Sequence, residues 1–384
     1  MRIIHCITDE KFVENIITTF EFLGDRCDNR YVHVTDKKKN YRFLEKFEKI
    51  EYLSTSRLEN ELFTNSCDVI FLHNLQSMPY KSISKIPQRI KVVWLAWGFD
   101  LYGHLASKPF IQIPHIIQPE TKRLLWTAWD KQLIEQVKIF LKNSRNQIIK
   151  KAVERIDFFS GVIPEEYDMM CDVPFFHARR IDYRYASPVS DITMSLVQTK
   201  SPVNGKNILI GNSGDPSNNH ADIFKKLSCL NLSGRLIYVP LSYGENPRYI
   251  EKIKAIGTKM WGDNFVALEK FMPSDEYKSV ISSCGFRFFG HERQQAMGNI
   301  YLALMDGCKV FLSETSVLWK HLSQMGVKLY SIQNEVNQEC LTNLMDAEET
   351  KSNRRIVIED LLTSTHRERL YNMIDFLKKE IEQC

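Results

Sequence analysis

The stretch "ILIGNSGDPSNNHADIFKKL", residues 208–227, decides the fold of the second half of the chain. Its first three residues form an apolar run typical of a buried strand, and the apolar residues from Ile223 onward recur at helical spacing. We expect Ser217 to be the N-cap of this helix. The two glycines of the polar turn permit positive φ and a close approach of a ligand to the backbone. The strand, turn and helix therefore predict free N–H groups that suit a phosphate; a capped loop without a ligand is the alternative.

Strands and helices alternate along the rest of the chain. In the second half the expected strands are "KNILIGN", "GRLIYVPLSY", "FVALEKF", "GFRFFG" and "KVFLS", with helices at 218–230, 246–256, 274–283 and 295–306. In the first half they are "RIIHCIT", "RYVHVT", "DVIFLHN" and "IKVVWLAW", with helices at 11–23 and 119–157, and "FFSGVIPEEYDMM" as a strand that turns into a helix. Such alternation predicts parallel sheets with helices on both faces.

The length and composition predict two domains. A chain of 384 residues with 43% hydrophobic residues is too long for one typical core. We expect a Rossmann-like domain at 1–188, a Ser- and Pro-rich linker at 189–206, a second Rossmann-like domain at 207–360, and a helix at 361–384 that can pack back on the first domain. Ligands of open α/β sheets bind at the carboxyl ends of the strands, so we expect a cleft between the two domains.

Charge and cysteine patterns exclude several classes of protein. The 51 basic and 47 acidic residues nearly cancel, which gives no global signature of nucleic-acid binding. The nine cysteines are scattered and form no C-x-x-C pair, so they predict reduced thiols and neither a disulfide framework nor a metal site. Asp9, Glu10 and Glu14 interrupt the apolar N-terminus, which argues against a signal peptide or a membrane span. We therefore expect a cytosolic protein whose contact with a membrane is peripheral.

A second strand–turn–helix junction lies in residues 285–313, "GFRFFGHERQQAMGNIYLALMDGCKVFLS". Its turn carries Arg293, Gln294 and Gln295 near a helix start. A guanidinium beside backbone N–H groups suits a pyrophosphate, and amide side chains suit sugar hydroxyls. A solvated polar turn with a surface arginine is the alternative. Neither junction has the G-x-G-x-x-G or Walker pattern, which argues against a dehydrogenase or a P-loop enzyme.

Candidate catalytic residues follow strands of the first half. In "WLAWGFDLYGHL", residues 94–105, Asp100 comes just after a strand, where a general base would stand. Neighbouring aromatic residues would raise its pKa by desolvation. The alternative is that Asp100 caps a helix and the tryptophans fill the core. His5 with Asp9, and His73 with Asn74, follow two further strands and are expected at the same edge of the sheet. Of these, His73 is our second catalytic candidate.

The segment 122–155 is basic and amphipathic. It has nine basic and three acidic residues, interleaved with Trp126, Trp129 and aliphatic residues. This make-up is typical of a helix that lies on an anionic membrane surface, and a solvated face over a core helix is the alternative. Nucleic acid is a poorer match, because the aromatic residues group with aliphatic ones and not with the charges.

Four of these stretches together resemble glycosyltransferase family 56: "ILIGNSGDPSNNH" (208–220), "RQQAMG" (293–298), "WGFDLY" (97–102) and "YVPLSYGENPRYIEKI" (238–253). The resemblance implies a GT-B fold with the acceptor bound by the first domain and the nucleotide-sugar by the second. It also implies transfer of 4-acetamido-4,6-dideoxygalactose (Fuc4NAc) from its dTDP-activated form to a polyprenyl-linked disaccharide in enterobacterial common antigen synthesis. Such an enzyme would work without a metal, at the inner face of the bacterial cytoplasmic membrane.

The resemblance also implies roles for individual residues. Asp100 matches the carboxylate of the W-G-x-D string and would be the catalytic base. The implied donor contacts are Gly211, Asn212, Ser213, Gly214, Asp215, Ser217, Asn218, Tyr243, Arg293, Gln294, Gln295 and Gly298. His291 and Glu292 stand beside this set without an assigned role. Two other functions are compatible with the same GT-B fold. They are a nucleotide-sugar epimerase or hydrolase, and a non-catalytic scaffold that binds sugar nucleotides.

Overall fold

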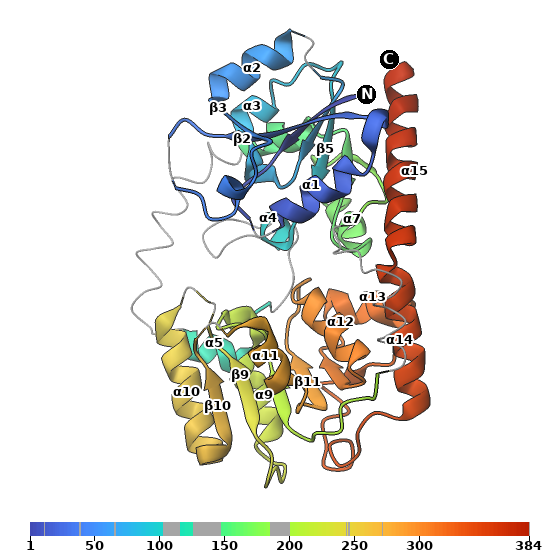
Figure 1. The fold of residues 1–384 in the computed structure, drawn as a ribbon. Helices are drawn as coiled ribbons and strands as arrows, with labels where there is room; N and C mark the ends of the chain where they lie inside the picture. The colour runs from blue at the N-terminus through green and yellow to red at the C-terminus, as the bar shows by residue number, and fades with distance from the viewer. Residues whose placement is uncertain are drawn as a thin grey trace. The chain divides into compact units, whose positions relative to one another are not determined.

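The computed structural model describes residues 1–10, 12–37, 40–64, 67–102, 116–125, 147–184, 200–242, 244, 246–270 and 272–383. The chain forms two compact units. The first comprises Met1–Gln112, Lys131–Pro188 and Thr363–Cys384, and the second comprises Ile113–Asp130 and Val189–Leu362. The segment 113–130 therefore belongs to the second unit, which differs from the expected boundary at residue 188. Figure 1 shows both units, each with its own parallel sheet.

The first unit is built on a seven-stranded parallel sheet in the order β3-β2-β1-β4-β5-β6-β7. Its strands are β1 (Arg2–Cys6), β2 (Asp28–Val34), β3 (Ile50–Leu53), β4 (Val69–Leu72), β5 (Lys91–Leu95), β6 (Phe158–Ser160) and β7 (Arg179–Arg180). Its helices include α1 (Val13–Glu21), α2 (Thr55–Phe63), α3 (Tyr80–Ile83), α4 (Gly98–Tyr102), α7 (Glu165–Met170) and α15 (Thr363–Glu382). The sequence order reverses between β1 and β4, so this is the switch point where loops diverge to opposite faces.

The core of the first unit is completed by the end of the chain. Strand β4 is buried along its whole length, as expected for a central parallel strand. On α1, Ile16, Ile17 and Phe20 pack in the same cluster as Ile374 and Leu377 of α15. In Figure 1 this helix (red) lies beside α1 (blue). The helix α15 thus contributes to the hydrophobic core of the first unit.

The second unit contains a six-stranded parallel sheet in the order β10-β9-β8-β11-β12-β13. The strands are β8 (Ile208–Ile210), β9 (Ile237–Pro240), β10 (Phe265–Leu268), β11 (Phe286–Phe289), β12 (Lys309–Leu312) and β13 (Tyr330–Ser331). The helices include α5 (Pro119–Leu125), α9 (His220–Leu227), α10 (Pro247–Trp261), α11 (Ser274–Ile281), α12 (Met297–Met305), α13 (Val317–Gln324) and α14 (Ala347–Leu361). Its switch point lies between β8 and β11.

The expected linker and long helix are only partly described. Residues 189–199 lie outside the described residues, and the following stretch is bound to the second unit, where Val203 N–H donates to Asp306 O at 2.9 Å. Of the helix expected at 119–157, the structure has α5 in the second unit and helical residues 147–154 in the first, with 126–146 outside the described residues. In the described part of the chain no helix is both long and apolar enough to cross a membrane.

Candidate active site

The loops after β8 and β11 meet at the switch point of the second sheet. Gly211 follows β8 directly with φ +72°, and its N–H donates to Phe288 O at 2.8 Å. A Cβ at this position would stand 2.7 Å from Asn218 Oδ1 and 2.8 Å from His220 Nε2. Glycine is therefore required here both by the left-handed backbone and by the packing of the loop on itself.

The side chain of Asn218 holds the first loop in shape and joins it to the second. Its Oδ1 accepts from Asn212 N–H at 2.9 Å and from His291 Nε2 at 2.8 Å. Its Nδ2 donates to Ser213 Oγ at 3.1 Å and to Asp215 O at 3.0 Å. The side chain is fully buried and uses both donors and both acceptor positions. Asn218 therefore shapes the loop from inside.

Asp215, and not Ser217, acts as the N-cap of the turn. Asp215 Oδ1 accepts from Ser217 N–H at 2.9 Å at the start of a short 3-10 helix, Pro216–Asn218. The helix α9 begins only at His220, behind Asn219 in the left-handed conformation. The predicted N-cap at Ser217 was wrong, because Pro216 starts a separate turn and an asparagine tolerates φ > 0. The hydroxyl of Ser217 instead lies 2.7 Å from Gln295 Oε1, which again joins the two loops.

Asn219 ties a distant segment to the site. Its Nδ2 donates to Gly290 O at 2.7 Å, and its Oδ1 accepts from Gln118 N–H at 2.8 Å. The carboxylate of Asp222 accepts from the N–H groups of Glu120 and Thr121, each at 2.9 Å. These bonds explain why residues 116–125 pack with the second unit. These contacts could not be predicted from the sequence, because nothing in the local pattern pairs residues a hundred positions apart.

The second loop, residues 290–296, carries the cationic side chain. Glu292 is buried and accepts from Gln118 Nε2 and from Thr315 Oγ1, both at 2.7 Å, so its role is to hold the loop. The Nε of Arg293 donates to Gln295 Oε1 at 3.0 Å, and Gln295 Nε2 lies 3.3 Å from Asn212 Oδ1. Gln295 therefore orients the guanidinium and anchors it to the first loop.

For three further residues of the predicted donor set, the described part of the structure gives no contact that joins them to the two loops. Gln294 is partly exposed in the same turn. Gly298 lies in the first turn of α12, where an added Cβ would meet nothing within 4 Å, so packing does not require a glycine there. Tyr243 lies outside the described residues. Beside it, a Cβ on Gly244 would stand 2.7 Å from the backbone of Gly214, so the loop after β9 touches the first loop closely.

Arg293 supplies the positive charge of this site, while the carboxylates of Asp215 and Glu292 accept hydrogen bonds within and around the loops. Burial lowers the pKa of His220 and of His291 to about 3, so both imidazoles are neutral. No described residue accepts a hydrogen bond from the N–H groups of Ser213 and Gly214. The site thus offers backbone donors and one oriented guanidinium, an arrangement that can bind an anion.

Two histidines meet at the switch point of the first sheet. Asn29 Nδ2 donates to Phe20 O at 3.0 Å, which directs its Oδ1 to His5 Nε2 at 3.1 Å. His5 must therefore carry its proton on Nε2 and accept at Nδ1 from His73 Nε2, 2.9 Å away. The lone pair of His73 is then on Nδ1. Burial lowers the pKa of His5 to about 3 and that of His73 well below its usual value, so both rings are neutral.

Asp100 joins the loops after β4 and β5. Its Oδ1 accepts from Leu75 N–H at 3.2 Å, and its Oδ2 accepts from Trp97 N–H at 3.1 Å and Trp94 Nε1 at 3.3 Å. Trp97 in turn donates from Nε1 to His73 O at 2.7 Å, so the two catalytic candidates share one neighbour. Burial raises the pKa of Asp100 to about 7. The three donors leave about one of the four acceptor positions of the carboxylate.

Two other predicted features have structural roles at this edge. The carboxylate of Asp9 accepts from the N–H groups of residues 42–44 and thereby holds that loop. Asn74 Nδ2 donates to Thr8 Oγ1 at 2.7 Å. The described ends of the basic segment 122–155 belong to different units, with residues 126–146 outside the described residues. In the described ranges no group of three or more His, Cys, Asp or Glu side chains could hold a metal ion.

Comparison with solved structures shows the GT-B fold. The lipopolysaccharide outer core galactosyltransferase WaaB in its apo form has a TM-score of 0.60 at 11% identity, over 97% of this chain and 99% of that chain. HepE of Anabaena, in complex with UDP and glucose, has a TM-score of 0.58 at 8% identity over the same shares. The E. coli structure described as trehalose-6-phosphate bound with UDP-2-fluoro glucose has a TM-score of 0.60 at 10% identity, over 98% and 99%. The predicted fold class, two doubly wound Rossmann-like domains, is confirmed.

The sequence itself matches one family over residues 120–350, more than half of the chain. The family is described as 4-alpha-L-fucosyltransferase glycosyl transferase group 56. The match contains both loops of the second switch point, whereas His73 and Asp100 lie before it. The chain belongs to glycosyltransferase family 56, and the protein is a glycosyltransferase.

Proposed function

We propose that the protein transfers a deoxyamino sugar similar to Fuc4NAc from a nucleoside diphosphate, namely dTDP, to a glycan carried on polyprenyl diphosphate in surface polysaccharide synthesis. The observation that carries this proposal is the junction of two loops at the second switch point, where Asn218 bonds His291 and Ser217 lies against Gln295. Ligands of doubly wound sheets bind at this position. The family description, 4-alpha-L-fucosyltransferase, supports a sugar of the fucose type, and the resemblance in sequence implies the polyprenyl-linked acceptor.

Donor binding would use the backbone and Arg293. The N–H groups of Ser213 and Gly214 would donate to phosphate oxygens, and the guanidinium would face the diphosphate in the direction set by Gln295. Tyr243 and Gln294 would contact the nucleotide or the sugar. Two structures with the same fold contain UDP or a UDP-sugar, which supports a nucleotide-sugar donor.

The transfer step would begin at the acceptor hydroxyl. Asp100 would accept the hydroxyl proton with its remaining acceptor position, while the oxygen forms a bond to C1 of the sugar. The bond from C1 to the diphosphate breaks, and the diphosphate leaves with the electron pair. Arg293 and the loop N–H groups would stabilise its added negative charge, so we propose that no metal is needed. His73, whose backbone carbonyl accepts from the Trp97 indole, would be the second catalytic residue at this edge.

The acceptor would be reached at a membrane surface. The basic amphipathic segment 122–155 has the composition to contact anionic headgroups at the inner face of the cytoplasmic membrane. The protein would attach there peripherally and would have no nucleic-acid partner.

A thermal-shift panel of dTDP-, UDP- and GDP-sugars tests the donor. A ligand at about a hundred times its Kd adds about 2.7 kcal/mol to the free energy of unfolding, which gives a clear rise in Tm. We expect the largest rise with a dTDP-sugar, and the same rise in EDTA. The absence of a shift with every nucleotide would contradict the proposal.

A further inference from the structure

A crevice in the first unit is formed by two helices that are far apart in the sequence. It has a volume of about 130 Å³ and lies between α1 and α15. On α1 and its C-cap the lining includes Thr18, Thr19 and Phe22, and on α15 it includes His366, Arg367 and Leu370. On each helix these residues have the spacing of one face, so the crevice runs along both helices. Neither candidate active-site loop contributes to it.

The chemistry of the crevice is apolar inside and cationic at the edge. Phe22 is 40% exposed although it is a large aromatic residue, and the Arg367 guanidinium lies over its ring, 3.8 Å from the ring centre. Arg184 and His366 also line the crevice, and its lining among the described residues includes neither Asp nor Glu. A surface that combines apolar and basic side chains fits a ligand that has an apolar chain beside an anionic group.

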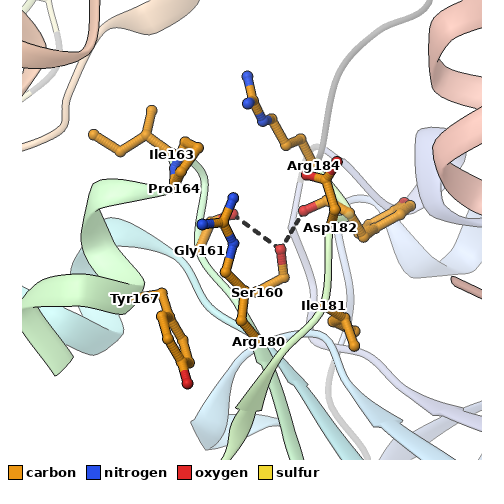
Figure 2. A pocket seen from close by; sticks show the side chains of 10 residues that line it. Ser160, Gly161, Ile163, Pro164, Tyr167, Arg180, Ile181, Asp182 and Arg184 are labelled. Atoms are coloured by element: carbon orange, nitrogen blue, oxygen red, sulfur yellow. Dashed lines mark hydrogen bonds between the residues drawn. The ribbon is translucent and has the colours of Figure 1, made fainter. Parts of the chain in front are cut away.

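The crevice adjoins the carboxyl edge of the first sheet. Tyr183 and Arg184 also line a second pocket of about 10 Å³, between the turn after β6 and the segment after β7 (Figure 2). In that pocket Ser160 ends β6, and its carbonyl accepts from Ala96 N–H at 2.8 Å, next to the turn that contains Asp100. The basic border of the crevice thus continues to the edge that carries the proposed catalytic residues.

We propose that this crevice binds the diphosphate and the first part of the prenyl chain of the acceptor. The chain would lie against Phe22 and Leu370, and the phosphates would contact Arg184 and Arg367. This inference rests on the proposed function, because it assigns the lipid part of the proposed acceptor. A prenyl diphosphate is favoured over a bilayer phospholipid, because the crevice shares Tyr183 and Arg184 with the pocket at the edge that carries the proposed catalytic residues.

Binding of farnesyl diphosphate, a soluble short prenyl diphosphate, tests the proposal directly. It is measured by calorimetry on the full-length protein with saturating dTDP, which keeps the donor site occupied. Thr18→Trp places bulk in the crevice from an exposed position, and Arg367→Gln removes one charge. Asn372→Trp and Lys379→Gln are matched controls, because both residues are exposed on α15 outside the lining.

We expect each crevice variant to weaken farnesyl diphosphate binding about tenfold or more, and each control to leave it unchanged. Inorganic pyrophosphate should bind about tenfold more weakly than farnesyl diphosphate, since it lacks the chain. The inference is overturned if pyrophosphate binds as tightly, if the crevice variants bind like wild type, or if Arg367→Gln weakens only the binding of phosphatidylglycerol vesicles. The Tm rise with dTDP-sugars is read in the same variants, so a failed donor site is seen separately from a failed crevice.

Discussion

At the scale of single residues, Asp100 has two tasks that a substitution can separate. Its carboxylate binds three donors from two loops, and its pKa of about 7 places its ionisation in the working range of a general base. Asp100→Asn should lower kcat by about 10² or more, because an amide cannot take the proton. It should also cost about 1–3 kcal/mol of stability, because the amide NH2 faces donors. In the wild type, kcat/KM should rise with pH through about 7.

The matched control for this variant is Asp9→Asn. Asp9 lies at the same edge of the sheet and also accepts three N–H groups, all from the backbone. The Asp9→Asn variant should be less stable than wild type but should keep the same kcat per folded molecule. Donor-induced Tm shifts, measured alongside kcat, should be the same in both variants and in wild type. Equal turnover in Asp100→Asn and wild type would remove Asp100 from the mechanism.

Glu166 predicts a pH dependence of stability that has no catalytic component. It is fully buried, its Oε1 accepts from Tyr102 OH at 3.0 Å, and its Oε2 accepts from Val162 N–H at 2.7 Å. Burial raises its pKa from 4.5 to about 7, so the folded protein keeps a proton that the unfolded chain releases. This group therefore lowers the free energy of unfolding as pH rises from 4.5 to about 7.

Glu166→Gln removes this titration and keeps the hydrogen bonds, since the amide oxygen can accept from the backbone while its NH2 donates to the Tyr102 oxygen. The Tm of the variant should match wild type near pH 5 and exceed it at pH 8. Thermal unfolding of both proteins across this range measures the difference. A difference in Tm between the two proteins that stays constant across this pH range would show that the pKa of Glu166 is not raised.

Arg293 is the residue on which the proposed diphosphate contact depends. Removing a guanidinium that bonds an anion should weaken nucleotide binding about tenfold or more. Arg293→Ala should therefore reduce the affinity for dTDP, measured by calorimetry, with little change in Tm. Arg355→Ala removes an exposed arginine of α14 in the same unit and serves as the control. Equal dTDP affinity in the two variants would contradict the assignment.

At the scale of elements, the loop of residues 211–219 should act as one unit that Asn218 holds together. Asn218 is buried and bonds four groups, so it would affect a ligand only through the loop. Asn218→Ala should abolish most nucleotide binding and cost about 1–3 kcal/mol of stability. Asn207→Ala is the matched control, because Asn207 bonds Ser283 and Leu236 before the start of β8. The Asn207→Ala variant should destabilise the fold and leave dTDP affinity unchanged. If both variants lost dTDP affinity, the effect of Asn218→Ala would come from a general loss of stability and not from the loop.

The elements also show what the sequence could and could not predict. The strands β8 and β11 and their polar loops were predictable, because apolar runs and helical spacing are local patterns. The short β3 and α2 were missed, since their apolar pattern is brief. The bonds that assemble the candidate site, such as His291 to Asn218, join residues 73 positions apart and have no local signal. The prediction of Ser217 as an N-cap was wrong, because Pro216 begins a separate 3-10 turn.

At the scale of the whole molecule, chain order and unit membership do not coincide. The helix α15 completes the core of the first unit, and α5 packs with α9 and α10 in the second. Each unit is therefore built from segments that are separated in the sequence. Local patterns predict the helices and strands of such a chain. They do not predict which unit each element belongs to, because this is set by the long-range burial of apolar faces.

This arrangement predicts that one substitution near the C-terminus weakens the N-terminal sheet. Ile374 of α15 is fully buried among residues of α1 and the first sheet, so Ile374→Ala should cost about 2–5 kcal/mol. Ile253→Ala, at a fully buried position of α10, makes the same change in the second unit. Hydrogen exchange should rise in β1, β4 and α1 for Ile374→Ala, and in β8 and β9 for Ile253→Ala. Neither variant should change the affinity for dTDP at a temperature where it stays folded, because a loss of stability lowers apparent affinity only when unfolded molecules are populated. If Ile374→Ala instead increased exchange mainly in β8 and β9, the helix would belong energetically to the second unit.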